Sequence, residues 1–168
     1  MKTAIVYYSL TGNSRYAATS AARRLGADLI RLAPVKAYPD SGFRKYFWGG
    51  KSAVMGEEPE LEPYEFNADE YGRVIFCFPV WAGSPAPPIR TFIKENRGAL
   101  KGKKCAVLLC FSGGGDEKAL AKLRTFLGVN ELEAELVLVD PRDRSDASKD
   151  KAIEDFCKEL KRNDSNEA

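Results

Sequence analysis

The chain has 168 residues, of which 44% are hydrophobic and 30% charged, a composition typical of a globular protein with one domain, here residues 1–168. Its 26 basic and 24 acidic residues leave a formal net charge of +2, which is too balanced to indicate a nucleic-acid partner. No apolar run approaches the roughly 20 residues of a membrane span, and no signal peptide is visible. We therefore expect a cytoplasmic protein that binds neither nucleic acid nor membrane.

Apolar runs rich in β-forming residues alternate along the chain with stretches of helical periodicity. Five runs are predicted to be strands, at residues 3–8, 28–32, 73–78, 104–111 and 134–139. Apolar residues recur at helical spacing within residues 17–25, 89–93, 119–127 and 153–160. Strands that are apolar throughout and alternate with helices predict a parallel sheet covered on both faces. The expected fold class is therefore α/β, with a five-stranded, doubly wound parallel sheet.

The most informative segment follows the first predicted strand and precedes a helical stretch from Arg15 to Leu25. It is a polar turn that consists of Ser9, Leu10, Thr11, Gly12, Asn13 and Ser14. A strand–turn–helix junction directs unpaired backbone N–H groups to one point, where the helix dipole also favours an anion. The turn therefore predicts a site for a phosphate monoester. The alternative is that Thr11 or Asn13 only caps the helix.

The connection between the second and third predicted strands, residues 33–70, is too long for a simple turn. A helix over residues 42–54, covering one face of the sheet, is expected within it. Seven acidic residues follow between Glu57 and Glu70 with no basic residue among them, and six basic residues lie between Arg90 and Lys104. These two stretches indicate two solvated surfaces or, alternatively, a docking patch for a charged partner.

A second loop follows the third predicted strand and is stiffened by prolines, which fix φ. Its candidate site residues are Pro79, Val80, Trp81, Ala82 and Gly83. An indole offers a flat surface to a planar heteroaromatic ring, and small neighbouring residues let backbone groups approach the edge of that ring. The alternative is that Trp81 packs against a neighbouring loop.

A third loop follows the fourth predicted strand and is rich in glycine. Its candidate site residues are Ser112, Gly113, Gly114, Gly115 and Asp116. In a doubly wound sheet ligands bind beyond the carboxyl ends of the strands, so the three loops are expected to converge. Asp116 is expected to be the N-cap of the next helix; the less favoured alternative is a catalytic carboxylate.

The residue types in the chain narrow its chemistry. There is no histidine, which removes the commonest acid–base catalyst and the commonest metal ligand, and no metal site or catalytic residue is predicted. The four cysteines lie in apolar runs without a C-x-x-C pair, so they are expected to be buried and free: Cys77, Cys105, Cys110 and Cys157.

Taken together, the three loops resemble those of flavodoxin-like FMN-binding proteins of the short-chain type, and the resemblance extends over essentially the whole chain. The family's phosphate loop, a T-G-N-[ST] turn after the first strand, is matched by Thr11, Gly12, Asn13 and Ser14. Its two flavin loops are matched in position by residues 79–83 and 112–116. The resemblance implies the flavodoxin-like strand order 2-1-3-4-5 and FMN as the cofactor.

The resemblance further implies a redox protein that transfers electrons to or from partner proteins, as a monomer or a homodimer. Ser9, Thr11, Asn13 and Ser14 would hold the FMN phosphate, Trp81 would stack on the flavin, and backbone groups of residues 82–83 and 113–115 would meet its polar edge. The alternative is an FMN-dependent NAD(P)H oxidoreductase that acts on quinones or other small acceptors. The third loop lacks the aromatic residue of many flavodoxins, so the second flavin face is open to a substrate or covered by Tyr46, Phe47 or Trp48.

Single mismatched residues exclude membership in several other families. Residues 49–52 imitate the end of a P-loop, but the required first glycine is replaced by Lys45. A thiol phosphatase loop at Cys110 would need an arginine where Asp116 stands. A receiver-like module would need aspartates after the first and third strands, where Ser9 and Pro79 stand, and no G-x-G-x-x-G spacing supports a dinucleotide fold.

Overall fold

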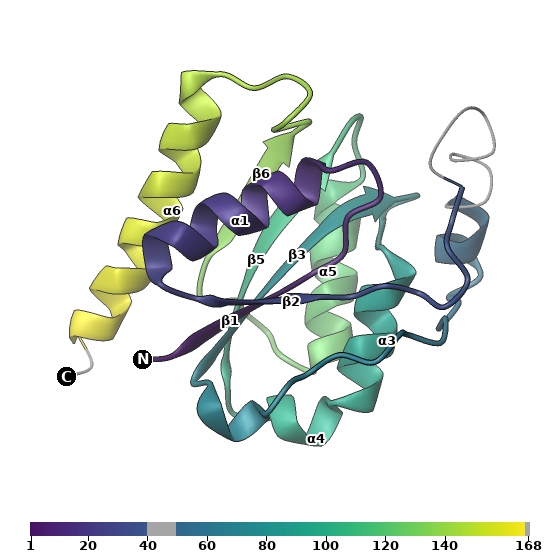
Figure 1. The fold of residues 1–168 in the computed structure, drawn as a ribbon, viewed down its shortest axis with the longest axis horizontal. Helices are drawn as coiled ribbons and strands as arrows, with labels where there is room; N and C mark the ends of the chain where they lie inside the picture. Colours follow the sequence, from purple (N-terminus) through teal and green to yellow (C-terminus); the bar gives the residue numbers. More distant parts are fainter. Residues whose placement is uncertain (40–49, 167–168) are drawn as a thin grey trace.

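The computed structural model describes residues 1–39 and 50–166. Five parallel strands form the centre of this part of the chain (Figure 1): β1 (Thr3–Tyr7), β2 (Asp28–Arg31), β3 (Arg73–Trp81), β5 (Lys104–Phe111) and β6 (Glu135–Val139). They lie in the order β2-β1-β3-β5-β6, with every neighbouring pair parallel. The α/β class and the expected strand order 2-1-3-4-5 are confirmed.

Helices cover both faces of the sheet, because successive residues of the buried strands point to opposite sides. α1 (Asn13–Leu25) and α6 (Ala147–Asn166) pack on one face, against strand residues such as Ile5, Ile75 and Leu108. α3 (Pro87–Glu95) and α5 (Asp116–Leu127) pack on the other face, against Val6, Phe76 and Val107. The four cysteines are buried and free, as expected.

The second predicted loop is more regular than expected. β3 continues to Trp81 because β4 (Ser84–Pro85) folds back against it as an antiparallel strand, with Val80 opposite Pro85 and Trp81 opposite Ser84. Two short elements were also missed: the 3₁₀ turn η1 (Ala68–Glu70) and α4 (Arg97–Leu100). Their few residues carry too little periodicity to be recognised in the sequence.

The long connection is only partly described. Residues 50–54 are helical, but the rest of the helix predicted over residues 42–54, with Tyr46, Phe47 and Trp48, lies outside the described residues. Beyond it, the acidic stretch crosses α3 and meets part of the basic one. Glu58 accepts a hydrogen bond from Arg90 Nε (3.1 Å) and pairs with Lys94, and the hydrogen bond from Lys94 is the main cause that lowers the pKa of Glu58. These two stretches therefore partly neutralise each other.

At the amino-terminal edge of the sheet, Arg73 is buried, with only 1% of its surface exposed. Its guanidinium donates two hydrogen bonds of 2.6 Å to Glu133, just before β6, and one of 2.7 Å to Asp164 in α6. It also donates to the Leu160 carbonyl at 3.2 Å. One side chain thus joins β3, the approach to β6 and α6. No helix in the described part of the chain has the length and apolar character needed to cross a membrane.

Asp146 is expected to make stability depend on pH in the acid range. It receives backbone hydrogen bonds from Ser148 (2.9 Å) and Lys149 (3.1 Å), and hydrogen bonds, from the Ser148 hydroxyl first, lower its pKa from 3.8 to about 2. Because the folded pKa lies below the unfolded one, this contribution is complete above about pH 4 and is lost as the pH falls through about 2. Urea unfolding at several acid pH values should show a weaker pH dependence for Asp146→Asn. Asp155→Asn, in the helix that begins at Ala147, is the control, and identical profiles for Asp146→Asn and the unmodified chain would contradict the assignment.

Candidate functional site

A cavity of about 530 Å³ lies at the carboxyl edge of the sheet, where the loops after β1, β3 and β5 meet. The predicted residues that line it are Ser9, Leu10, Thr11, Asn13, Ser14, Pro79, Val80, Trp81, Ala82, Gly83, Ser112, Gly113 and Gly114. The predicted residues Gly12, Gly115 and Asp116 do not line it. The three loops converge because the carboxyl ends of parallel strands share one edge.

The turn after β1 leaves polar groups available for an anion. Gly12, with φ of +103°, occupies the N-cap of α1, and no side chain caps the helix. Ser9 Oγ accepts a hydrogen bond from Gly12 N at 3.1 Å, so its own hydroxyl proton remains available. The alternative prediction, that Thr11 or Asn13 only caps α1, is wrong because the glycine takes that position.

Ser14 Oγ is the clearest sign that the turn suits an anion. Ser14 is 1% exposed, lines the cavity, and within the described residues its hydroxyl is the one buried side-chain polar atom without a hydrogen-bond partner. An unsatisfied buried polar group costs about 1–3 kcal/mol, so such a group calls for an explanation. An anion at the turn would accept the hydrogen bond.

Asn13 lines the cavity as predicted and also makes contacts that the sequence did not indicate. Its Oδ1 accepts hydrogen bonds from the backbone N–H groups of Arg142 (2.8 Å) and Asp143 (3.3 Å), while its Nδ2 donates to Asp143 Oδ2 (2.9 Å). The side chain therefore ties the turn to the loop between β6 and α6. Because the amide nitrogen carries two hydrogens and Asp143 accepts one of them, the second remains available as a donor to a phosphate.

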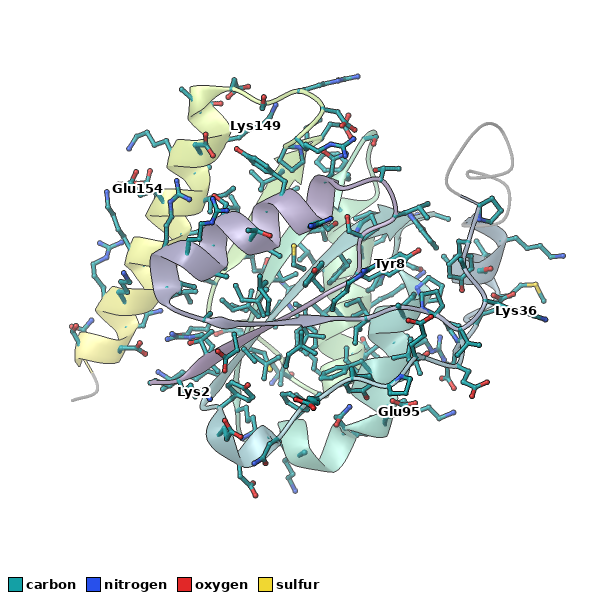
Figure 2. The ribbon with its side chains drawn as sticks, in the orientation of Figure 1. Lys2, Tyr8, Lys36, Glu95, Lys149 and Glu154 are labelled. Atoms are coloured by element: carbon teal, nitrogen blue, oxygen red, sulfur yellow. The ribbon has the colours of Figure 1, made fainter. Side chains whose placement is uncertain are left out.

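Trp81 lines the cavity and also packs against two neighbouring aromatic rings. It lies half-buried on the cavity wall and also contacts Tyr8 and Tyr38 edge-on, with ring centroids 5.6 and 5.1 Å away. Figure 2 shows Tyr8 among the interior side chains at the end of β1. Burial raises the pKa of Tyr8, so the phenol stays neutral. These aromatic contacts hold Trp81 in place at the rim.

The hairpin turn beside Trp81 is strained and touches the third loop. Ala82 has φ of +48°, a left-handed conformation that costs a non-glycine residue about 1–2 kcal/mol. A Cβ atom on Gly115 would lie 3.0 Å from Gly83 Cα, so glycine at position 115 lets the two loops meet. Gly115, with φ of +88°, is also the N-cap of α5, which makes Asp116 the first helical residue and the predicted Asp116 cap wrong.

Four residues that the sequence analysis missed also line the cavity: Gly50, Cys110, Phe111 and Asp140. Asp140 follows β6 with φ of +41°, and its Oδ1 accepts a hydrogen bond of 2.6 Å from Ser112 Oγ. A carboxylate directly after a predicted strand, at the same edge as the three loops, was a signal that could have identified it. Residues 1–39 and 50–166 contain no group of three or more metal-ligating side chains placed to hold an ion.

No protein-family model and no functionally described protein matches the sequence. Solved structures do resemble it. A candidate flavoprotein from Bacteroides eggerthii aligns with a TM-score of 0.75 and 22% identity, over 94% of this chain and 96% of its own. A flavoprotein in complex with FMN from Lactobacillus acidophilus aligns with a TM-score of 0.69 and 18% identity, over 84% of this chain and 95% of its own. The two-electron reduced flavodoxin of Megasphaera elsdenii aligns with a TM-score of 0.58 and 14% identity, over 94% of this chain and 99% of its own. The chain therefore has the flavodoxin-like fold.

Proposed function

We propose that the chain binds FMN in the cavity at the carboxyl edge of the sheet and acts as a redox protein that passes electrons to or from partner proteins. The observation that carries the proposal is the buried Ser14 hydroxyl, which has no hydrogen-bond partner among residues 1–39 and 50–166 and lies beside a glycine-capped helix N-terminus. A phosphate monoester supplies the missing acceptor. The flavodoxin-like fold and the FMN in the L. acidophilus structure support this choice of ligand.

The residues around the cavity suit the two ends of FMN. The hydroxyls of Ser9, Thr11 and Ser14 and the backbone N–H groups of the turn would hold the phosphate, with Asn13 keeping the turn in place. Trp81 would contact the flavin ring, and the bare backbone of residues 113–114 would face its polar edge. FMN would supply one- and two-electron redox chemistry, while the protein contributes position and electrostatics.

The second candidate function is an FMN-dependent NAD(P)H oxidoreductase that acts on quinones or other small acceptors. It is favoured by the third loop, where exposed Gly113 and Gly114 bring no side chain to the cavity rim. A planar substrate could approach the ring from that side. Mixing the FMN-loaded protein with NADH or NADPH distinguishes the functions, because rapid bleaching of the flavin absorption is expected only of the oxidoreductase.

The direct test is a titration of the purified protein with FMN, followed by absorption and by quenching of flavin fluorescence. We expect one FMN per chain and tighter binding of FMN than of riboflavin, which lacks the phosphate. Equal affinities for the two flavins would contradict the assignment of the turn, and no binding of either would reject the proposed function.

Trp81→Ala is expected to weaken FMN and riboflavin binding alike, by about 1–3 kcal/mol, because the indole would contact the ring that both ligands share. Dissociation constants from fluorescence titration measure the effect. Trp81→Phe is the matched control, since it keeps an aromatic face against Tyr8 and Tyr38 and should retain most of the affinity. If Trp81→Ala binds both flavins as tightly as the unmodified chain, Trp81 has only a packing role.

A further inference from the structure

A second cavity, of about 580 Å³, lies on the face of α1 that points away from the sheet, beside the loop between β6 and α6. Four arginines and a single carboxylate, Asp150, line it: Arg15, Arg23, Arg24 and Arg142. The chain as a whole is almost neutral, with a net charge of +2. The concentration of guanidinium groups is therefore a local property of this cavity.

The floor of the cavity is built by helical spacing. Arg15, Thr19 and Arg23 recur every four residues along one row of α1, and a second row carries the Ser20 hydroxyl. Arg15 and Arg23 are eight residues apart, which is about 12 Å along the helix axis. Two flexible arginine side chains at this separation can contact two phosphate groups of one ligand, with hydroxyl donors between them.

Within the described residues, two of the four arginine side chains have no ion-pair or hydrogen-bond partner. Arg142 pairs with Asp143 at 2.6 Å, and Arg24 donates to the Ser20 carbonyl at 3.1 Å. Asp150 accepts a hydrogen bond of 2.7 Å from the Tyr16 hydroxyl. In the described part of the chain, Arg15 and Arg23 are exposed and form no ion pair. The cavity thus holds uncompensated positive charge.

Helix stability does not explain the position of Arg15. It lies in the first turn of α1, where the helix dipole disfavours a cation, and that turn contains no acidic residue. The Arg142 guanidinium covers the same end of the helix, since a Cβ on Gly12 would lie 2.2 Å from Arg142 Nη1. Two guanidinium groups beside the positive end of a helix are unfavourable for the dipole, so this end of the cavity, like the adjoining turn, favours an anion.

We propose that this arginine cavity binds the phosphate groups of a second ligand, an inorganic diphosphate or a nucleoside diphosphate. Guanidinium groups bind phosphate oxygens through paired, charge-assisted hydrogen bonds, which makes arginine better suited to this role than lysine. The ligand is either a free diphosphate or the phosphorylated half of a nucleotide such as NADPH. This site adjoins the one proposed for FMN, because Gly12 of the same turn lines it, but the two cavities share no lining residue and the proposal does not depend on FMN binding.

The test is calorimetric titration of the FMN-saturated protein with inorganic pyrophosphate, since FMN saturation closes the first anion site to the probe. The test variant is Arg15→Gln/Arg23→Gln, which removes two exposed, unpaired charges. The matched control is Arg97→Gln/Lys101→Gln, which removes two exposed charges at α4, near the opposite edge of the sheet (Figure 1). We expect one pyrophosphate per chain, bound at least about tenfold more weakly by the test variant and unchanged in the control. Equal affinity in both variants, or no binding to the unmodified chain, would overturn the proposal.

Titrations with ADP and 2′,5′-ADP distinguish the two sources of phosphate. Tighter binding than pyrophosphate identifies a nucleotide, and weaker binding a free diphosphate; in either case the arginine dependence must remain. If the chain proves not to bind FMN, the same titration is made on the ligand-free protein with Ser14→Ala, which alters only the first cavity. Loss of pyrophosphate binding in Ser14→Ala but not in Arg15→Gln/Arg23→Gln would place the probe at the turn and reject the arginine site.

Discussion

Ser14→Ala is expected to weaken FMN binding by about 1.5–3 kcal/mol and, in the ligand-free protein, to raise the free energy of unfolding by about 1 kcal/mol. The two effects have opposite signs for one reason. Within the described residues, the Ser14 hydroxyl is buried without a partner, and a bound phosphate would accept its hydrogen bond. Removing the hydroxyl therefore stabilises the free protein and removes one hydrogen bond from the complex. Flavin titration and urea unfolding of the same two samples measure both quantities.

Riboflavin provides the internal comparison, because it has no phosphate and its affinity should not change in Ser14→Ala. Ser20→Ala is the matched variant: it lies on the same helix but outside the first cavity, and should leave FMN affinity unchanged. If Ser14→Ala instead lowers the stability of the free protein and leaves the FMN affinity intact, the hydroxyl has a structural partner and the phosphate assignment fails.

Arg73→Met is expected to destabilise the protein by about 3–5 kcal/mol, the usual cost of removing one partner from a buried ion cluster. Glu133 would lose two hydrogen bonds of 2.6 Å and Asp164 would lose two, of 2.7 and 3.3 Å, so of the ion pairs in the described residues these carboxylates would keep only the longer one of 4.0 Å between Lys104 and Glu133. The contact between α6 and the sheet would be weakened. Urea unfolding monitored by far-ultraviolet circular dichroism gives the change in free energy.

A rescue experiment separates charge from packing. Adding Glu133→Gln and Asp164→Asn to Arg73→Met should restore part of the lost stability, because no uncompensated charge is then left near the sheet edge. Arg97→Met, at an exposed position, controls for the substitution itself and should change stability by less than about 0.5 kcal/mol. A loss below about 1 kcal/mol in Arg73→Met would mean that solvent already compensates the cluster.

The parallel sheet was predictable because its strands are buried on both faces and therefore read as continuous apolar runs, separated by helical periods. Its strand order followed from the resemblance carried by the turn at residues 11–14 and is confirmed. The convergence of three loops on one cavity followed from the shared edge of parallel strands. The sheet and the convergence of the loops depend on the local apolar pattern and on the right-handed connections between parallel strands, which hold for almost all sequences.

The errors concern how side chains are used once the loops meet. Asn13 is expected to face a phosphate, but the sequence did not indicate that its Oδ1 also binds the backbone of residues 142–143, about 130 positions later in the chain. Asp116 was expected to cap α5, but Gly115 takes that position because only a glycine fits against Gly83. Asp140 was overlooked because its role depends on the Ser112 hydroxyl of another loop. These partners are brought together only by the tertiary fold, so they leave no periodic pattern in the sequence.

By itself the sequence determined the class of fold, the buried faces and the place of the candidate site, since apolar periodicity and turn chemistry act between near neighbours. Only the tertiary structure decided which polar groups remained without partners. The free Ser14 hydroxyl, the buried Arg73 cluster and the unpaired arginines on α1 all result from distances between segments remote in the chain. Hydrogen bonds and ion pairs are directional and short in range, so their completion or absence depends on packing.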